Sequence, residues 1–336
     1  MKIHRIFAAF YAAALCTFTV YLALDTFVLQ TVYQTNASEM NLSMFEQEPS
    51  ADTSINTDSS EEKQSRKTTG RRKSSQADAS SEISGKNNPD PTVSTNGTER
   101  TFSNSDMTVT LKEYRFSDTT VYAADVQLSS AQYLKSAFAY DTYGKNITAA
   151  TSSIAAEHDA VLAVNGDYYG VQETGYVIRN GIVYRDSSNG KDLLCVFSDG
   201  SMQILSSNDY TAEELVDAGV WQAYCFGPAL IENGCISVSA GEEVGRAMAS
   251  NPRTAIGMID NLHYVLVVSD GRTTESSGLS LSELADFMLS LGVKTAYNLD
   301  GGGSSAMYFQ GEIVNKPTTN GNRIQERGVS DIVYIG

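Results

Sequence analysis

The sequence predicts an α+β fold, a single mixed domain with largely antiparallel sheets and a few helices, preceded by a transmembrane helix and a disordered stalk. Three observations predict this order. The chain opens with a long apolar run, continues with a strongly polar stretch, and changes near Thr101 to short strand-like runs separated by turn residues. We therefore divide it into a cytoplasmic N-terminus and membrane anchor (1–34), a disordered polar linker (35–100) and a folded domain (101–336).

The N-terminal segment combines basic residues with an apolar run of spanning length. Lys2 and Arg5 precede a run from Ile6 to Leu24, which is long enough to cross a bilayer. Basic residues on this side favour a cytoplasmic N-terminus. A cleaved secretory signal peptide is the alternative, although the run is long for one and no A-x-A site follows it. With either reading we expect the folded domain outside the cytoplasm, and with the anchor it stays at the cell membrane as a single-pass protein.

Composition, net charge and cysteine spacing exclude several kinds of structure and partner. Residues 35–100 are rich in Ser, Thr, Asn, Asp, Glu and Lys, so they cannot bury enough apolar surface to fold. The net charge of −16 repels polyanions, and we expect no nucleic-acid partner. Cys195, Cys225 and Cys235 form no CxxC pair, which argues against a structural zinc site. One disulfide among them is compatible with export, but the sequence does not choose the pair.

Beyond Thr101 the predicted elements are mostly strands. Strand-like runs cover 107–116, 119–128 and 160–165. Hairpins are predicted where Asn-Gly, Asp-Gly or Asp260-Asn261 separates apolar runs, in 176–185, 193–205, 228–238 and 254–270. Helices are fewer: a short one at 151–158 and a clearer one at 281–291, with Ser280 as N-cap, Glu283 three residues later and Gly292 past its end.

Several common catalytic motifs are excluded. The stretch GGGSSA (301–306) fits G-x-G-x-x-A, but no helix and second strand follow it, so a dinucleotide site is rejected. Ala306 stands where a serine-esterase elbow needs glycine, and no P-loop is present. The chain has three histidines, of which only His158 and His263 lie in the folded domain. A Ser-His-Asp triad or a His-rich zinc site is therefore disfavoured, and carboxylates and arginines remain.

Five segments of the folded domain carry a resemblance to a known family. They are AVLAVNGDYYG (160–170), NPRTAIGM (251–258), VSDGRTTESSGLSLSELADFMLSLG (268–292), NLDGGGSSAM (298–307) and ERGVSDIVYIG (326–336). In this order they resemble the phosphodiester glycosidase family, over the whole of 101–336. The resemblance implies hydrolysis of the sugar–oxygen bond of a sugar-1-phosphodiester. The departing phosphate monoester needs little protonation, so such a site needs an anion clamp and a carboxylate that acts as base or nucleophile.

The resemblance and the residue types together suggest catalytic carboxylates. Asp300 comes first, because it follows a strand and precedes the glycine loop within a family motif. Asp167 comes second; the family's lysosomal member has glycine there, so Asp167 would tune specificity or bind a cation. Glu326 is a further candidate acid. Tyr168 and Tyr169 could offer a sugar-stacking face, with core packing as the alternative.

The candidate substrate-binding residues share arginine, amide or glycine chemistry on these motifs. Arginine forks suit a phosphate, and bare glycine backbone lets a substrate approach. Arg253, expected to bind the phosphate, and Arg327 fall on family motifs, and Arg272 comes third. An ion pair at the surface is the alternative for each arginine, and holding a turn is the alternative for Asp270. The full set is Asn165, Arg253, Asp270, Arg272, Asn298, Gly301, Gly302, Gly303, Ser304 and Arg327.

The function expected from the sequence is a membrane-anchored extracellular hydrolase that acts on sugar-1-phosphodiesters, with surface glycans as its setting. The expected partners are a carbohydrate or sugar-phosphate substrate and the membrane, through the N-terminal helix. No cofactor is required by the sequence, and a divalent cation is compatible with the carboxylates. Two alternatives stay open: a noncatalytic glycan-binding surface module and an ordinary glycoside hydrolase.

Overall fold

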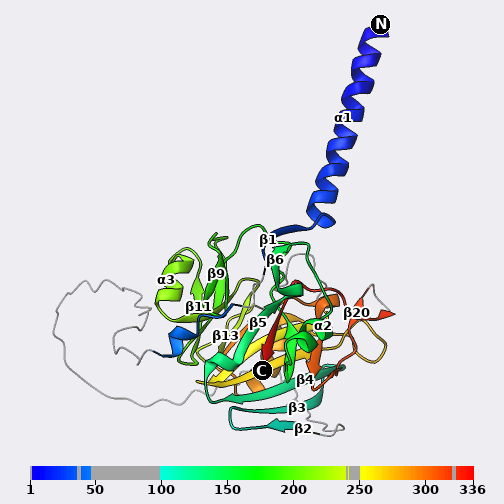
Figure 1. The fold of residues 1–336 in the computed structure, drawn as a ribbon. Coiled ribbons are helices and arrows are strands. Elements are labelled where there is room, and N and C mark those ends of the chain that lie inside the picture. Colours follow the sequence, from blue (N-terminus) through cyan, green and yellow to red (C-terminus); the bar gives the residue numbers. More distant parts are fainter. Residues whose placement is uncertain (1, 36–38, 47–98, 240, 242–249, 320–322) are drawn as a thin grey trace, which may run out of the picture.

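The folded domain is built on three antiparallel sheets. A computed structural model describes residues 2–35, 39–46, 99–239, 241, 250–319 and 323–336 (Figure 1). The largest sheet has eight strands, and two further sheets have five strands each. In the described residues the strand pairs are antiparallel, and a few short helices accompany them. The predicted α+β class with largely antiparallel sheets is thus confirmed.

The strands are numbered along the chain, and their order within each sheet departs from that numbering. The eight-stranded sheet runs β14 (Cys235–Ile236), β13 (Ala229–Glu232), β17 (Thr295–Asn298), β15 (Arg253–Asp260), β16 (His263–Ser269), β4 (Thr119–Leu128), β3 (Met107–Phe116) and β2 (Arg100–Ser103). One five-stranded sheet runs β11 (Met202–Ser206), β10 (Asp192–Phe197), β12 (Val220–Tyr224), β8 (Val177–Arg179) and β9 (Ile182–Arg185). The other runs β19 (Glu312–Ile313), β18 (Met307–Phe309), β7 (Leu162–Asn165), β22 (Asp331–Ile335) and β5 (Leu134–Phe138).

Helices, 3₁₀ turns and two strand pairs complete the structure. The helices are α1 (Lys2–Phe27), α2 (Thr151–Glu157), α3 (Ala212–Asp217) and α4 (Leu281–Ser290). The 3₁₀ turns are η1 (Leu42–Phe45), η2 (Ala131–Tyr133), η3 (Ala139–Asp141) and η4 (Gly302–Ser304). Two strand pairs stand apart from the large sheets: β1 (Thr31–Thr35) with β6 (Thr142–Lys145), and β20 (Thr318–Thr319) with β21 (Arg323–Ile324).

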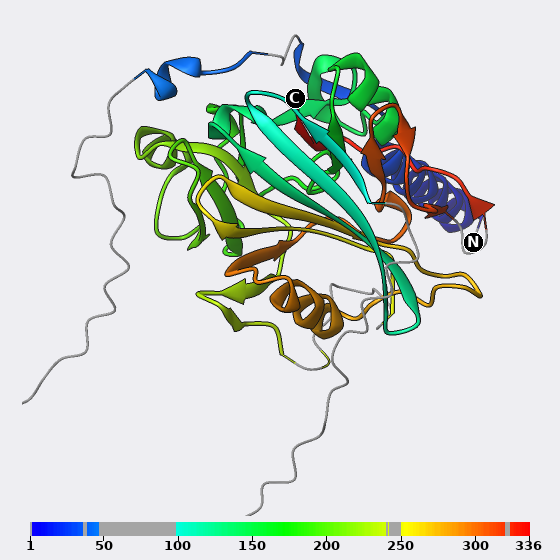
Figure 2. The same cartoon turned by 90° about the horizontal axis from the view of Figure 1, so that it is seen from below.

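The main core lies between the eight-stranded sheet and the two smaller sheets. Val109 and Leu266 from the large sheet are fully buried together with Val164 and Leu194 from the smaller ones. Alternation along the strands sends the other side chains to the opposite faces, where helices cover them. Helix α4 packs on the outer face of the eight-stranded sheet, and α2 and α3 cover the outer faces of the smaller ones (Figure 2).

Most predicted elements are confirmed. The strands at 107–116 and 119–128 and the four hairpins are present, and α4 has its capping box, in which the Ser280 Oγ accepts from the Glu283 N–H at 3.2 Å. The turn between β15 and β16 is shifted by one residue from the predicted Asp260-Asn261, because Leu262 takes a left-handed conformation there. Helix α3 was not predicted, although Thr211 and Glu214 form a capping box at its start.

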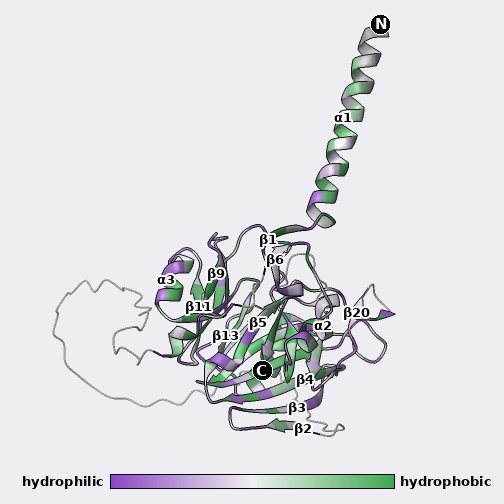
Figure 3. Ribbon diagram, viewed as in Figure 1, coloured by the Kyte–Doolittle hydropathy of each residue, from purple (hydrophilic) through white to green (hydrophobic). Residues whose placement is uncertain are grey.

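The N-terminal segment differs from a free anchor and stalk. Helix α1 occupies the predicted apolar run and mixes hydrophobic with hydrophilic residues (Figure 3). Among the described residues no helix is long and apolar enough to cross a membrane, so the predicted span is not confirmed. Strand β1 pairs with β6, and the Phe45 ring meets the Trp221 ring edge-on at 5.0 Å. Most of the predicted linker, 47–98, lies outside the described residues.

Candidate active site

The candidate site forms where strands from two sheets end beside each other. Strand β7 ends at Asn165, and β17 leads through Leu299 to Asp300. The Asn165 side-chain N–H donates to the Asp300 backbone carbonyl at 2.6 Å, and its Oδ1 accepts from the Thr254 hydroxyl at 2.7 Å. Asn165 is fully buried, and its side chain holds the two strand ends together through these hydrogen bonds.

Asp300 and Arg327 form an ion pair at this junction. Their Oδ2 and Nη2 atoms are 2.9 Å apart, and the second carboxylate oxygen accepts from the Gly301 N–H at 2.9 Å. The Asp300 side chain is 13% exposed and that of Arg327 is 40% exposed, so solvent and a ligand can reach the pair. Burial raises the pKa of the Asp300 carboxyl above its ordinary value, against the opposing effect of Arg327. Ser304 orients the arginine, because its Oγ accepts from the Arg327 Nε–H at 3.0 Å.

The glycine loop makes room for arginine side chains. A Cβ added to Gly302 would lie 2.8 Å from the Arg272 Nη2 atom, and one added to Gly303 would lie 3.6 Å from the Arg327 Cδ atom. Gly302 also has a left-handed backbone, with φ of +61°. Part of the reason for the glycine run is therefore close packing against Arg272 and Arg327, in addition to the expected approach of a substrate.

Arg272 is held by a neutral partner. Its Nη2 and Nε atoms donate to the Asn251 Oδ1 at 2.9 and 3.2 Å. Its backbone is left-handed, with φ of 59°, which is uncommon for a residue with a side chain and costs on the order of 1–3 kcal/mol. In the hydrogen bonds of the described residues, the half-buried Arg272 guanidinium has no carboxylate acceptor that would offset its charge beside the loop.

Three further predicted binding residues are buried and support the loops. Arg253 is 3% exposed and its Nε donates to the Leu279 carbonyl at 2.9 Å, beneath the glycine loop. Asp270 accepts from the Lys316 N–H at 2.8 Å, which fixes the turn that carries Arg272, and burial raises its pKa. The Asn298 amide donates to the Gly227 carbonyl at 2.8 Å. The turn-holding role given as the alternative for Asp270 fits these contacts.

The two secondary catalytic candidates do not share the position of Asp300. Asp167 is 1% exposed, and its carboxylate bonds to Arg179 at 2.8 Å and to the Cys225 N–H at 2.8 Å. Glu326 accepts from the backbone N–H and the hydroxyl of Ser152, at 3.0 and 2.6 Å, at the start of α2. Both carboxylates thus bind elements of the fold, whereas the Asp300 carboxylate lies beside the glycine loop and is paired with the half-exposed Arg327.

The two neighbouring tyrosines are divided between the site and the core. Tyr168 is 38% exposed, and its ring lies 5.9 Å from the Arg327 guanidinium carbon. Tyr169 is 2% exposed and stacks on Tyr143, with ring centroids 5.3 Å apart. Of these two rings, that of Tyr168 is therefore exposed beside the Asp300–Arg327 pair, and that of Tyr169 packs in the core.

Residues outside the predicted set also shape the site. Arg179 and Asp331 bind the segment that carries Tyr168, and Thr254 orients Asn165. The signal for Arg179 was present in its position inside an apolar hairpin, where a charged side chain needs a buried partner. The partner could not be chosen from the sequence, because Asp331 lies 152 residues away.

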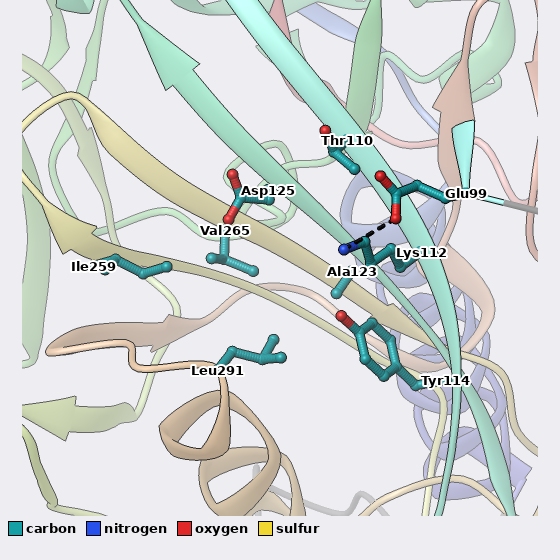
Figure 4. Close-up of a pocket in the computed structure, with 9 residues that line it drawn as sticks. All are labelled: Glu99, Thr110, Lys112, Tyr114, Ala123, Asp125, Ile259, Val265 and Leu291. Carbon is teal, nitrogen blue, oxygen red and sulfur yellow. Dashed lines mark ion pairs between the residues drawn. The ribbon is translucent and has the colours of Figure 1, made fainter. Parts of the chain in front are cut away.

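A separate pocket lies on the outer face of the eight-stranded sheet (Figure 4). It has a volume of about 310 Å³, and its wall includes the ion pair of Lys112 and Glu99 at 3.1 Å. None of its lining residues belongs to the Asp300–Arg327 site. Within the described part of the chain, no group of three or more His, Cys, Asp or Glu side chains is arranged to hold a metal ion, and all four cysteines are free.

Comparison with known proteins connects this geometry to one family. A family model described as phosphodiester glycosidase matches residues 158–336. The SPbeta prophage-derived uncharacterized protein YomE of Bacillus subtilis is 28% identical over 175 residues, which is 51% of this chain and 26% of that protein. Human N-acetylglucosamine-1-phosphodiester alpha-N-acetylglucosaminidase is 42% identical over 66 residues, 20% of this chain and 13% of the human protein. The matches thus span about a quarter of the prophage protein and about an eighth of the human enzyme.

A solved structure shows the same fold. The catalytic domain of zebrafish N-acetylglucosamine-1-phosphodiester alpha-N-acetylglucosaminidase, auto-inhibited by pro-peptide, superposes with a TM-score of 0.55. The superposition covers 71% of this chain and 88% of the zebrafish chain, at 19% sequence identity. At this level of identity the likeness supports the fold alone.

Proposed function

The chain belongs to the phosphodiester glycosidase family, and from this premise we propose that it hydrolyses the bond between the sugar and the phosphate of sugar-1-phosphodiesters. The observation that carries the proposal is the accessible Asp300–Arg327 pair, with Arg272 packed against the same glycine loop at Gly302. A carboxylate and two guanidinium groups at one loop are the chemistry that this reaction needs.

The charge of the site fits a phosphodiester better than a neutral glycoside. Asp300 offsets the charge of Arg327, whereas Arg272 has a neutral partner in Asn251. The net charge of these three ionisable groups is therefore one positive, which matches the single negative charge of a phosphodiester. Planar guanidinium groups bind phosphate oxygens through paired hydrogen bonds, so we assign the phosphate to Arg272 and Arg327, with the buried Arg253 supporting the loop from beneath.

Asp300 would act on the anomeric carbon. As a nucleophile, its carboxylate forms a bond to this carbon while the sugar–oxygen bond breaks and the electron pair leaves with the phosphate monoester; water then hydrolyses the glycosyl–enzyme. As a base, it takes a proton from water that attacks the same carbon. In both versions a pKa raised by burial makes Asp300 a stronger base than an exposed aspartate. Tyr168 would stack on the sugar ring.

The test is a panel assay on the purified folded protein. Sugar-1-phosphodiesters and neutral aryl glycosides of the same sugars are compared by release of reducing sugar, with and without a chelator. We expect turnover of phosphodiesters only, unaffected by the chelator, because the mechanism uses side chains alone. Turnover of both substrate types would favour an ordinary glycoside hydrolase. Binding of glycans without turnover of either would favour a noncatalytic module.

We further propose that the folded domain acts outside the cytoplasm. The support is the basic and apolar N-terminal sequence, which is typical of an exported chain. Protease added to intact cells should remove the folded domain while a cytoplasmic marker stays intact. Protection of the domain until the cells are lysed would contradict this location.

A further inference from the structure

A buried charge cluster lies beneath the candidate site. The Arg179 guanidinium lies 2.8 Å from an Asp167 oxygen and 2.9 Å from an Asp331 oxygen. All three side chains are 1% exposed. The Arg179 guanidinium also donates to the Ala223 carbonyl and lies 4.5 Å from the centre of the Tyr224 ring. Such a cluster is costly to bury unless its geometry is nearly fully satisfied, so its position beside the site calls for an explanation.

The cluster binds strands from both smaller sheets. Arg179 ends β8, and Asp331 begins β22 of the neighbouring sheet. Asp167 belongs to the segment 165–170, which leaves the end of β7 and carries Tyr168 into the site. The guanidinium therefore fixes this segment from below, at the point where the two sheets meet.

The segment is packed too tightly on β22 to move without the cluster. A Cβ added to Gly166 would lie 2.2 Å from an Asp331 carboxylate oxygen, and one added to Gly170 would lie 2.2 Å from the Ser330 Oγ. The Gly166 N–H donates to the Asp331 carbonyl at 2.9 Å, and its carbonyl accepts from the Asp300 N–H at 3.2 Å. The backbone of Gly166 thus connects Asp331 of the buried cluster to Asp300, the proposed catalytic residue.

Tyr168 depends on this support. Its backbone is left-handed, with φ of 66°, and a non-glycine residue holds such a conformation only when its surroundings enforce it. At its amino side Asp167 is fixed by Arg179, and at its carboxyl side the Tyr169 carbonyl accepts from Arg185 at 3.2 Å. The ring is in this way held over Arg327 instead of turning into the core with Tyr169.

We propose that Arg179 is a positioning residue for the reaction: through Asp167 and Asp331 it fixes the segment 165–170, so that Tyr168 and Asp300 keep their contacts with Arg327. This inference rests on the proposed function for its catalytic consequence. Its structural consequence, an ordered segment 165–170, stands without it.

The cluster has two carboxylates and one guanidinium, and this imbalance should make the free energy of unfolding depend on pH. Two carboxylates share one guanidinium, and burial raises the pKa of Asp331 to about 7, with Arg179 opposing and Asp167 reinforcing the shift. The other ionisable groups of the described residues that interact with the cluster are buried or half-buried: Tyr143, Tyr169, Tyr184, Tyr224, Cys225 and Tyr297. Below this pKa the cluster holds one proton and is neutral. The stability that Asp331 contributes is then full below the ordinary carboxyl pKa of 3.8 and is lost as the pH rises to about 7.

The first experiment is a double-mutant cycle on the full chain. Arg179→Lys keeps the charge but cannot bridge two carboxylates, and it is measured alone and together with Tyr168→Ala, with Arg100→Lys as a matched surface control. We expect Arg179→Lys to lower kcat/KM for a sugar-1-phosphodiester about tenfold alone and by a clearly smaller factor in the Tyr168→Ala background, where only its effect on Asp300 remains. Equal losses in both backgrounds would overturn the positioning role and leave Arg179 a merely structural residue.

The second measurement separates this inference from the proposed function. Amide hydrogen exchange of a peptide covering 165–172 should accelerate about tenfold or more in Arg179→Lys and not in Arg100→Lys. Unchanged exchange would contradict the inference even in an active enzyme. Faster exchange in a protein that hydrolyses no phosphodiester would instead retain the ordered segment and reject the proposed function.

A third variant, Asp331→Asn, covers the case in which Arg179→Lys fails to fold: it weakens one of the two carboxylate contacts of Arg179, so exchange of the 165–172 peptide should accelerate, and unchanged exchange would contradict the inference. Asp331→Asn removes the shared proton and keeps the shape. The difference in unfolding free energy between the wild type and Asp331→Asn should fall as the pH rises from about 4 to about 7 and then level off, because over this range the folded wild type holds a proton that its unfolded chain has already released. A difference that does not change with pH would contradict the shared-proton cluster.

Discussion

Two groups of arginine and aspartate in this molecule have the same chemistry and opposite surroundings. Asp300 and Arg327 are 2.9 Å apart and are 13% and 40% exposed. Arg179 lies 2.8 Å from Asp167 and 2.9 Å from Asp331, and all three are 1% exposed. The two groups have similar distances and differ in solvent exposure. A substrate can reach Asp300 and Arg327, which we call the open pair. The buried cluster of Arg179, Asp167 and Asp331 can only hold its neighbours in place.

The comparison shows how burial divides the work of similar residues. In the open pair a phosphate could take over part of the contact that Asp300 makes with Arg327, because water already reaches the arginine. In the buried cluster each lost partner leaves a charge without compensation, which typically costs about 3–5 kcal/mol. The two groups are still connected, since the Asp300 N–H donates to the carbonyl of Gly166, one residue before Asp167.

Replacing Asp300 by asparagine should have the largest effect on turnover. The amide keeps the shape and the hydrogen bond from the Gly301 N–H but cannot act as base or nucleophile. We expect kcat for a sugar-1-phosphodiester to fall by roughly 10²–10⁴-fold, while binding of substrate survives. Steady-state kinetics and equilibrium binding on the same preparation measure the two quantities.

The matched control is the exposed pair of Arg100 and Glu312, whose charged atoms are 2.7 Å apart. Glu312→Gln removes a carboxylate from an arginine in the same way, but at the surface and away from the glycine loop, and turnover should stay within about twofold. Near-normal turnover in Asp300→Asn would show that the open pair does not carry the chemistry.

Removing the arginine of the open pair should separate charged from neutral substrates. Arg327→Ala deletes a guanidinium that we assign to the phosphate, so transition-state stabilisation for phosphodiesters should drop by about 2–4 kcal/mol. A neutral aryl glycoside offers this arginine no charge, and any turnover of it should change much less. Arg100→Ala serves as the control, and equal losses on both substrate types would remove Arg327 from phosphate recognition.

The pH dependence of the open pair has a definite sign. Burial raises the pKa of Asp300 and Arg327 lowers it, so the carboxylate form is lost as the pH falls through a value above that of an ordinary aspartate. Arg327→Gln removes the lowering influence and should move the acidic limb of the kcat/KM profile to higher pH. A limb that stays in place or moves to lower pH would mean that another group controls it.

The open pair could be predicted from the sequence, and the buried cluster could not. Asp300 and Arg327 lie on motifs rich in glycine and serine, which indicate a functional loop. The structure brings the two side chains within 2.9 Å of each other. Arg179 lies in an ordinary-looking hairpin, and its two carboxylate partners are distant in sequence: Asp331 begins a strand of another sheet, and Asp167 lies in the segment that follows β7. Only the tertiary fold brings them to Arg179. Asp167 illustrates the limit, because its motif indicated importance but not whether its carboxylate faces a substrate or an arginine.

The contacts between the N-terminal segment and the folded domain also could not be predicted from the sequence. Composition alone favours a free linker from residue 35, but a few apolar side chains within it find partners on the domain. Phe45 meets Trp221, and Met44 lies within 2.6 Å of a Cβ built on Gly181. Two such side chains in a polar segment do not stand out in a window average, so their docking depends on a surface that the sequence does not reveal.

Deleting the segment before Glu99 tests whether the region around the buried cluster of Arg179, Asp167 and Asp331 depends on that segment for stability. Tyr33 of β1 lies 5.6 Å from the Tyr143 ring, which stacks on Tyr169 beside the buried cluster. We expect the shortened protein to fold and keep its activity but to lose about 1–3 kcal/mol of unfolding free energy, since it lacks this ring contact and the Phe45–Trp221 contact. Chemical denaturation measures the loss. Full-length Tyr33→Ala with Phe45→Ala should reproduce much of it, and a shortened protein of unchanged stability would show that the docked segment adds nothing.

The smallest expected effect belongs to Glu326, the carboxylate next to the open pair in sequence. Both of its oxygens accept from Ser152 at the start of α2, where a negative charge also meets the positive end of the helix. Glu326→Gln keeps one acceptor and loses the charge, so the unfolding free energy should fall by about 0.3–1 kcal/mol. Turnover should stay within about twofold, because Arg327 keeps its bonds to Asp300 and Ser304.

This last variant decides between two roles for Glu326. A catalytic acid would lose kcat by roughly a hundredfold or more on amidation, whereas a helix cap loses only stability. Ser152→Ala is the matched control, because it removes one of the same hydrogen bonds without touching Glu326. Similar small losses of stability in the two variants, with kcat retained in both, would establish the cap. A large loss of kcat confined to Glu326→Gln would place a second carboxylate in the reaction and extend the open pair to three residues.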